Sequence, residues 1–173
     1  MRSTKANARE LTLLAVCTAV LFGAKEAVSL LPNIEPVTLL LLLYTLIFGR
    51  KTLWIIAAFV LLEGLLYGFG MWWPMYVYIW PLWHLAVQLL SRLRPTPLLW
   101  ACAAGLFGLT FGALCVPAYM VFSGTAGAFG WWIAGIPMDL LHGAGNFVIT
   151  LALFTPLYRV LTRLVSIPGG SAP

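Results

Sequence analysis

Charged residues are scarce in this chain. Asp, Glu, Lys and Arg make up 9% of its 173 residues, whereas 62% are hydrophobic and the mean hydropathy is +0.97. A soluble domain carries about a quarter charged residues, so this composition excludes an ordinary soluble domain. It predicts an integral membrane protein that forms one compact domain over residues 1–173.

Several catalytic and metal-binding patterns are missing as well. The three cysteines (Cys17, Cys102 and Cys115) are an odd number without CxxC spacing, so we interpret them as small core residues. There is no HExxH sequence, and the basic stretch FGRKT lacks the GxxxxGK[ST] pattern of a phosphate-binding loop. We therefore expect no catalytic residue, no metal, no resident cofactor and no ATP hydrolysis in this chain itself.

What the chain does contain is six long apolar segments. They run at residues 10–31, 35–49, 53–71, 74–91, 97–122 and 129–159. A membrane-spanning helix needs about 20 residues, or somewhat fewer when it is short, so the sequence predicts an all-α bundle of six transmembrane helices. The basic residues ahead of the first segment also suit a signal peptide. No small-x-small cleavage site follows them, however, so we expect a retained span.

Basic residues are distributed on one side of these segments. Nine of the ten lie before the first segment, between segments two and three, between four and five, or after the sixth; Lys25 is the exception. Positive charge marks the cytoplasmic side of a membrane protein, so we expect both termini in the cytoplasm. The net charge of +5 then reflects topology, and no nucleic-acid partner is expected.

The loops on the opposite side are rich in glycine and aromatic residues. They are LLPNIEP, YGFGMWWPMY and FSGTAGAFGWW, and they carry Trp72, Trp73, Trp131 and Trp132. Tryptophan favours the headgroup region, so an interfacial aromatic belt is one interpretation. Loops that close over a ligand are the other.

Three polar residues share one face of the sixth segment. At about 100° per residue, Asp139, His142 and Asn146 lie within roughly 60° of one another on a helix. A carboxylate at mid-membrane costs on the order of 3 kcal/mol, so Asp139 should face a cavity or a partner. The cluster predicts contact with a ligand or an ion, or else hydrogen bonds between helices.

The fourth segment offers a second face, made of aromatic residues with polar tips. Its members, within about 80° of one another, are Trp73, Tyr76, Trp80 and Trp83, with His84 at the edge. Such stripes are often core or lipid-facing, but these tips need hydrogen-bond partners that lipid does not supply. With Glu63 and Tyr67 on the third segment, they predict a site between the outer halves of segments three, four and six.

The predicted binding site draws on both faces and on the outer loops. We expect its residues to be Asn33, Trp73, Tyr76, Trp80, His84, Tyr119, Trp132, Asp139, His142 and Asn146. An intramembrane enzyme built on Asp139 and His142 is an alternative, but no serine lies at a suitable depth to complete a nucleophilic triad. The two histidines and two of the acids could in principle hold a metal.

The first segment carries small residues at every fourth position, namely Ala15, Ala19 and Gly23. Small residues at this spacing allow helices to approach closely in a membrane, where the hydrophobic effect does not drive their association. The ladder predicts a docking face for a partner protein or, alternatively, packing inside the bundle.

Longer stretches of the chain resemble a known family. AVCTA in the first segment and LLPNIEPVTLLLLLYTLIFGRKTLWIIAAFVLLEGLLYGFGMWW are similar to the substrate-binding S components of energy-coupling factor (ECF) vitamin transporters, most of all the cobalamin type. GALCVPAY and DLLHGAGNF extend the resemblance over nearly the whole chain. The AxxxA motif of the family maps onto Ala15 and Ala19.

This resemblance implies a multi-pass protein of the bacterial cell membrane that captures a vitamin from outside. The expected ligand is cobalamin or a corrinoid precursor, with another vitamin or small metabolite as the alternative. The implied partners are a transmembrane coupling subunit and two cytoplasmic ATPase subunits, which bind the ATP. The S component itself would topple in the bilayer to deliver its ligand. An ion-coupled or passive transporter without an ATPase is the alternative class.

Overall fold

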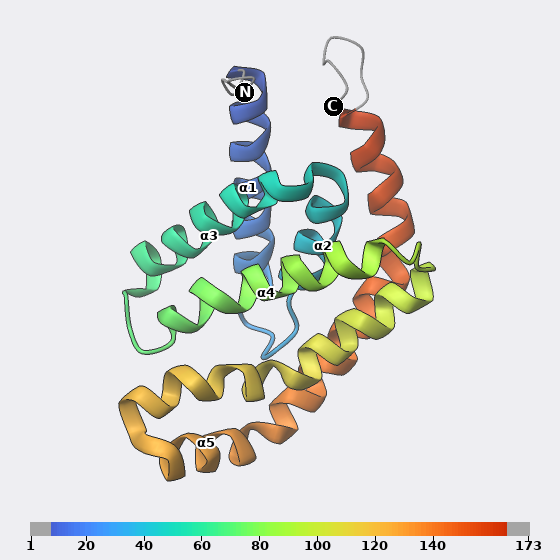
Figure 1. The fold of residues 1–173 in the computed structure, drawn as a ribbon. Helices are drawn as coiled ribbons and strands as arrows, with labels where there is room; N and C mark the ends of the chain where they lie inside the picture. Colours follow the sequence, from blue (N-terminus) through green and yellow to red (C-terminus); the bar gives the residue numbers. More distant parts are fainter. Residues whose placement is uncertain (1–7, 166–173) are drawn as a thin grey trace.

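The structure is a computed structural model that describes residues 8–165, and the regular elements of this part of the chain are all helices, without a strand (Figure 1). The elements are α1 (Ala8–Ala27), α2 (Val37–Phe48), the 3-10 helix η1 (Gly49–Lys51), α3 (Thr52–Tyr67), α4 (Trp73–Ser91) and α5 (Pro97–Val165). The all-helical prediction is therefore confirmed. Arg2 and Lys5, two of the residues used to predict the orientation, lie outside the described residues.

The longest element, α5, is a hairpin of two helical arms. The helical backbone is interrupted at Gly124, where φ is 69° and ψ is 175°, and the chain reverses direction there (Figure 1). Only glycine adopts this conformation without strain. The predicted loop FSGTAGAFGWW is thus wrong apart from this one residue, because its alanines and aromatics continue the helix on either side. We call residues 97–123 the first arm and residues 125–165 the second arm.

The segment between α1 and α2 is longer than the sequence predicts. The first apolar segment was expected to reach residue 31, but α1 ends at Ala27 and a connector of residues 28–36 follows. Pro32 and Pro36 lack a backbone N–H, and Asn33 has a φ of 54°, a value that asparagine tolerates better than most residues. These residues prevent the helix from continuing.

The centre of the bundle is α2. All of residues 37–45 are buried, and this helix contacts α1, α3, α4 and α5. A helix that is apolar on every side is expected to be surrounded by others. The two arms of α5 approach closely at Gly108, where a Cβ would lie 2.8 Å from the backbone of His142 and Gly143.

The outer surface of the bundle is largely apolar, and several polar side chains lie inside. Large hydrophobic side chains are exposed on every α-helix except α2, with Trp54 at 73% and Val148 at 61% as examples. Conversely, Glu63, His84 and Asn146 are buried. Two helical stretches of the described residues, Val37–Tyr67 and Pro97–Val165, are long and apolar enough to cross a membrane.

Candidate functional site

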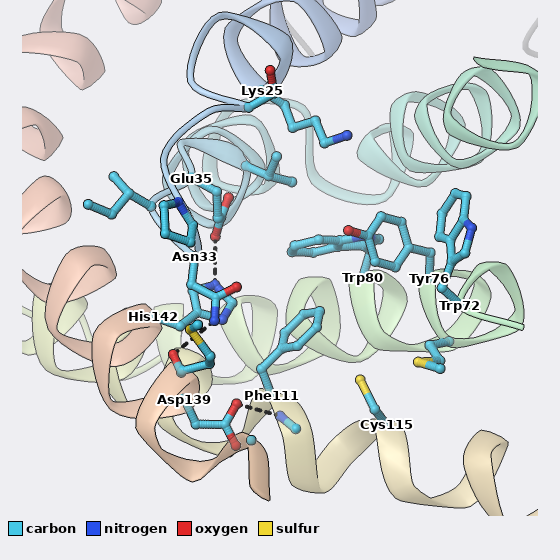
Figure 2. Close-up of a pocket in the computed structure, with 18 of the residues that line it drawn as sticks. Lys25, Asn33, Glu35, Trp72, Tyr76, Trp80, Phe111, Cys115, Asp139 and His142 are labelled. Atoms are coloured by element: carbon cyan, nitrogen blue, oxygen red, sulfur yellow. Dashed lines mark hydrogen bonds and ion pairs between the residues drawn. The ribbon is translucent and has the colours of Figure 1, made fainter. Parts of the chain in front are cut away.

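A cavity of about 820 Å³ lies among the connector, the ends of α1 and α3, the first half of α4 and both arms of α5. Cavities of about 300–1,000 Å³ hold small ligands in many proteins. Figure 2 shows two different walls: Glu35, His142 and Asp139 form a polar side, and Tyr76 and Trp80 belong to an aromatic side. The site therefore offers both charge and flat apolar surface.

The structure brings most of the predicted site residues together at this cavity. Seven of the ten line it: Asn33, Tyr76, Trp80, Tyr119, Trp132, Asp139 and His142. They come from segments far apart in the sequence. The hairpin of α5 brings its two arms together, and α4 packs against α5. The helical faces proposed from spacing on α4 and α5 thus point toward a common space.

The other three predicted residues lie outside the cavity and have protein partners. The indole N–H of Trp73 donates to the carbonyl of Val60 at 2.9 Å. The imidazole Nδ1 of His84 lies 3.0 Å from the Thr45 hydroxyl. The amide of Asn146 donates to the Thr38 hydroxyl at 3.1 Å. Trp73 faces α3, and the other two lie deeper along their helices, so all three contribute contacts between helices.

Asp139 is held at the cavity by one hydrogen bond. Its Oδ1 accepts from the backbone N–H of Gly112 at 3.0 Å, which joins the two arms of α5. Its Oδ2 is buried without a hydrogen-bond partner of ordinary geometry among the described residues, although Trp132 is a neighbour of the carboxylate. The side chain is 8% exposed, so this oxygen has lost water without gaining a full replacement.

Glu35 is a cavity residue that the sequence analysis did not single out. Its carboxylate accepts from the backbone N–H of Thr38 at 2.9 Å and from the Thr38 hydroxyl, which caps the start of α2. Its Oε1 also lies 3.2 Å from Nε2 of His142 (Figure 2). The connector is fixed to the second arm of α5 by this pair and by the Asn33 amide, which donates to the Met138 carbonyl at 3.0 Å.

Lys25 lines the cavity from the end of α1, inside a network of acids. Its Nζ lies 2.7 Å from Oε2 of Glu63 and 3.0 Å from Oε1 of Glu26. The Tyr67 hydroxyl donates to Glu26, and the ammonium lies 4.2 Å from the centre of the Tyr67 ring. The sequence showed Lys25 as the exception to the charge pattern, and the structure explains it: Glu63 on α3 is its partner.

Aromatic rings form the remaining walls of the cavity. Tyr119 and Trp131 stack across the α5 hairpin with ring centres 3.9 Å apart and planes inclined by 20°. On α4, Tyr76 makes an edge contact with Trp80 at 5.5 Å, and both rings face the cavity. Trp131 and Phe111 also line it, but they were not among the predicted residues, because a helical periodicity alone does not tell which aromatics face a cavity.

The cavity has few groups suited to covalent chemistry. Ser29 of the connector lines it, although no serine was expected at a suitable depth, and Cys115 lines it from the first arm. His142, however, is paired with Glu35 and not with either of them. Within residues 8–165, no three of the His, Cys, Asp and Glu side chains lie close enough together to hold a metal ion.

The small residues of α1 face away from the bundle. Ala15, Ala19 and Gly23 are all exposed, and nothing lies within 4 Å of where a Cβ at Gly23 would be. Of the two interpretations of this ladder, packing inside the bundle does not apply to the described structure. The stripe is an open surface along one side of α1.

Comparison of the chain with protein-family models, with curated proteins and with solved structures found no match. The features of the molecule that bear on its function are the cavity, the apolar exterior and the exposed small residues of α1.

Proposed function

We propose that this chain is the substrate-capturing S component of an ECF-type importer and binds a vitamin from the outside of the bacterial cell membrane. The observation that carries the proposal is a cavity of about 820 Å³ with aromatic walls and buried polar groups, inside a helical chain with an apolar exterior. Such a cavity can bind a ligand without transforming it, because it has no assembled nucleophile. The sequence resemblance supports the same role.

The membrane location within this proposal is supported by the distribution of side chains. A soluble monomer rarely exposes large continuous apolar patches, whereas the helices here expose leucine, valine and tryptophan along their length. We assign the six proposed spans to α1 to α4 and the two arms of α5. Lys51 pairs with Glu10 at 2.7 Å, so η1 lies beside the start of α1, as a common cytoplasmic side for these basic segments requires.

The ligand proposed first is cobalamin or a corrinoid precursor. A corrin ring has extended apolar faces, which suit rings such as Trp80 and Tyr76, and a rim of amides that can meet Asp139 and His142. Cobalamin is larger than the small ligands that cavities of this volume enclose, so we propose that it enters in part, with the remainder outside.

The binding test uses the purified chain and cobalamin, measured by calorimetry or by visible absorbance. Trp80→Leu removes a ring from the cavity and is expected to weaken binding about ten-fold or more, since buried aromatics dominate such contacts. Trp54→Leu is the matched control, because Trp54 is exposed and is not part of the cavity. If the wild-type chain binds no cobalamin, the ligand assignment fails; if both variants bind equally, the cavity is not the site.

The proposed partners are a transmembrane coupling subunit and two cytoplasmic ATPases, with the outer stripe of α1 as the docking face. Ala19→Trp is expected to abolish uptake and co-purification of the partners while it leaves ligand binding unchanged, because the side chain points away from the bundle. Val20→Trp, an exposed position on a different side of α1, is the control. Equal loss of binding and uptake in Ala19→Trp would argue against docking.

An ion-coupled transporter is the second candidate, and one observation favours it. The cavity contains the Glu35–His142 pair and Asp139, which are groups of the kind that carry protons in membrane transporters. Proteoliposomes that contain this chain alone separate the two candidates. Uptake without any ATPase would support ion coupling, whereas uptake only with the partner subunits would support the S-component role.

A further inference from the structure

The acidic residues of the chain are concentrated at one place. Four of the five lie on the cavity or on its cationic residue: Glu35 and Asp139 line it, and Glu26 and Glu63 pair with Lys25. The fifth, Glu10, pairs with Lys51 near the start of α1. Among the described basic residues, Lys25 is the one that lines the cavity.

Lys25 does not supply a free positive charge for a ligand. Two carboxylates lie within 3.0 Å of its Nζ, and the Tyr67 ring covers part of the ammonium. His142 is likewise occupied by Glu35 at 3.2 Å. The basic groups of the site are thus each matched by an acid, whereas Asp139 has no ion-pair partner among the described residues.

Two residues that line the cavity each carry a buried polar atom without a hydrogen-bond partner of ordinary geometry in the described part of the chain, although Trp132 is a neighbour of the Asp139 carboxylate, and the two atoms have opposite hydrogen-bonding character. Oδ2 of Asp139 can only accept when the group is ionised, and Nε1 of Trp80, on a side chain that is 2% exposed, can only donate. An amide-bearing ligand carries both kinds of group, an N–H that a carboxylate such as that of Asp139 accepts and a C=O that accepts from an indole N–H. A carboxylate offers no N–H and would place a second negative charge near Asp139.

We propose that the cavity selects neutral or cationic ring-shaped ligands that carry an N–H donor or a positive charge, and rejects anionic ones. The inference rests on the proposed function, since it names the ligand class of the same cavity. A cation is attracted by Asp139 and by the faces of the surrounding rings. An anion of the same shape is repelled by the carboxylate of Asp139, which no cation of the described residues offsets by an ion pair, and like-charge repulsion is a usual basis of rejection. The amide-rimmed cobalamin meets this requirement.

The test uses three probes that share one six-membered nitrogen ring and differ in charge. They are 1-methylnicotinamide, a cation methylated on its ring nitrogen, neutral nicotinamide and the nicotinate anion. Dissociation constants are measured by ligand-observed NMR titration of the full chain in lipid nanodiscs. We expect the cation and the amide to bind at least about ten-fold more tightly than nicotinate. Nicotinate binding as tightly as the other two, or no binding of any probe, would overturn the proposal.

A charge-removing variant locates the effect. Asp139→Asn is expected to erase most of the ten-fold preference against nicotinate, whereas Glu10→Gln removes an equal charge away from the cavity and should keep the wild-type order. If Asp139→Asn and Glu10→Gln behave alike, Asp139 does not set the selectivity. The wild-type ranking tests the proposal even if Asp139→Asn does not fold.

The outcome is separable from the proposed function. A chain that rejects nicotinate but binds no cobalamin and needs no ATPase for uptake would keep the selectivity and lose the S-component role. A chain that binds cobalamin and associates with ATPases but prefers nicotinate would keep the S-component role and lose the proposed selectivity.

Discussion

Glu35 and Glu10 each pair with a basic group, yet the two pairs have different surroundings. Glu35 is nearly enclosed and bonds to His142 and to the start of α2, whereas Glu10 pairs with a Lys51 side chain that is half exposed. Water and ions therefore screen the second pair more than the first. The same chemical change at the two positions should therefore have different consequences.

We predict that Glu35→Gln lowers the free energy of unfolding by about 1.5–3 kcal/mol, as expected for a charged hydrogen bond in a buried site. Glu10→Gln should change it by less than about 1 kcal/mol, as for other exposed pairs. Unfolding of both variants in the same detergent, followed by tryptophan fluorescence, measures the difference. Equal losses would mean that the connector is not held by Glu35.

Sequence periodicity located single residues well where they lie on helices. Asp139, His142 and Asn146 are all buried and face inward, as their shared helical face predicts. Periodicity did not tell which of them reaches the cavity and which meets another helix. Glu35 was missed because it lies in the connector, where the chain has no repeat that fixes the direction of a side chain.

At the scale of elements, the hairpin of α5 depends on how closely its arms approach. A methyl group at Gly108 would lie 2.8 Å from the backbone of His142 and Gly143, and a backbone cannot rotate away as a side chain can. The contact places the middle of the second arm, and with it Asp139 and His142, against the first arm.

Gly108→Ala is expected to destabilise the chain by about 1–3 kcal/mol, because the arms must separate to accept the methyl group. Gly130→Ala is the control: it lies in the same helix with nothing within 4 Å, so it should be neutral or slightly stabilising. Thermal unfolding of the two variants and of the wild-type chain measures the change in stability that each substitution causes. A Gly108→Ala chain as stable as Gly130→Ala would contradict the close approach.

The length of each apolar segment predicted the helices themselves better than it predicted where they begin and end. Residues 74–91 and α4 (Trp73–Ser91) differ by one residue, because Pro74 and the loop before it mark the start. The end of α1 and the FSGTAGAFGWW stretch were misplaced. Glycine content suggested a long loop there, but one glycine with positive φ suffices for the turn.

For the whole molecule, a charged side chain on the apolar exterior should be costly if that surface faces a bilayer and harmless if it faces water. Val148→Asp puts a carboxylate at an exposed position midway along the second arm, and in a membrane this is expected to cost about 2.5–3.5 kcal/mol. Leu164→Asp, also exposed but in the last turn of α5, should cost much less. The fraction of each variant recovered in the membrane after expression is the measurement. Equal recovery would argue against a span through Val148.

The pair of Lys25 and Glu63, 38 residues apart in the chain, limits how this protein can vary over generations. Glu63 is almost completely buried, and a buried charge that loses its partner costs about 3–5 kcal/mol. Replacing both groups by apolar residues of similar volume avoids that cost. Loss of Lys25 alone is therefore expected to be tolerated less well than loss of Glu63 alone, after which Lys25 keeps Glu26 as a partner, so a change at position 63 should come first in any path that removes both charges.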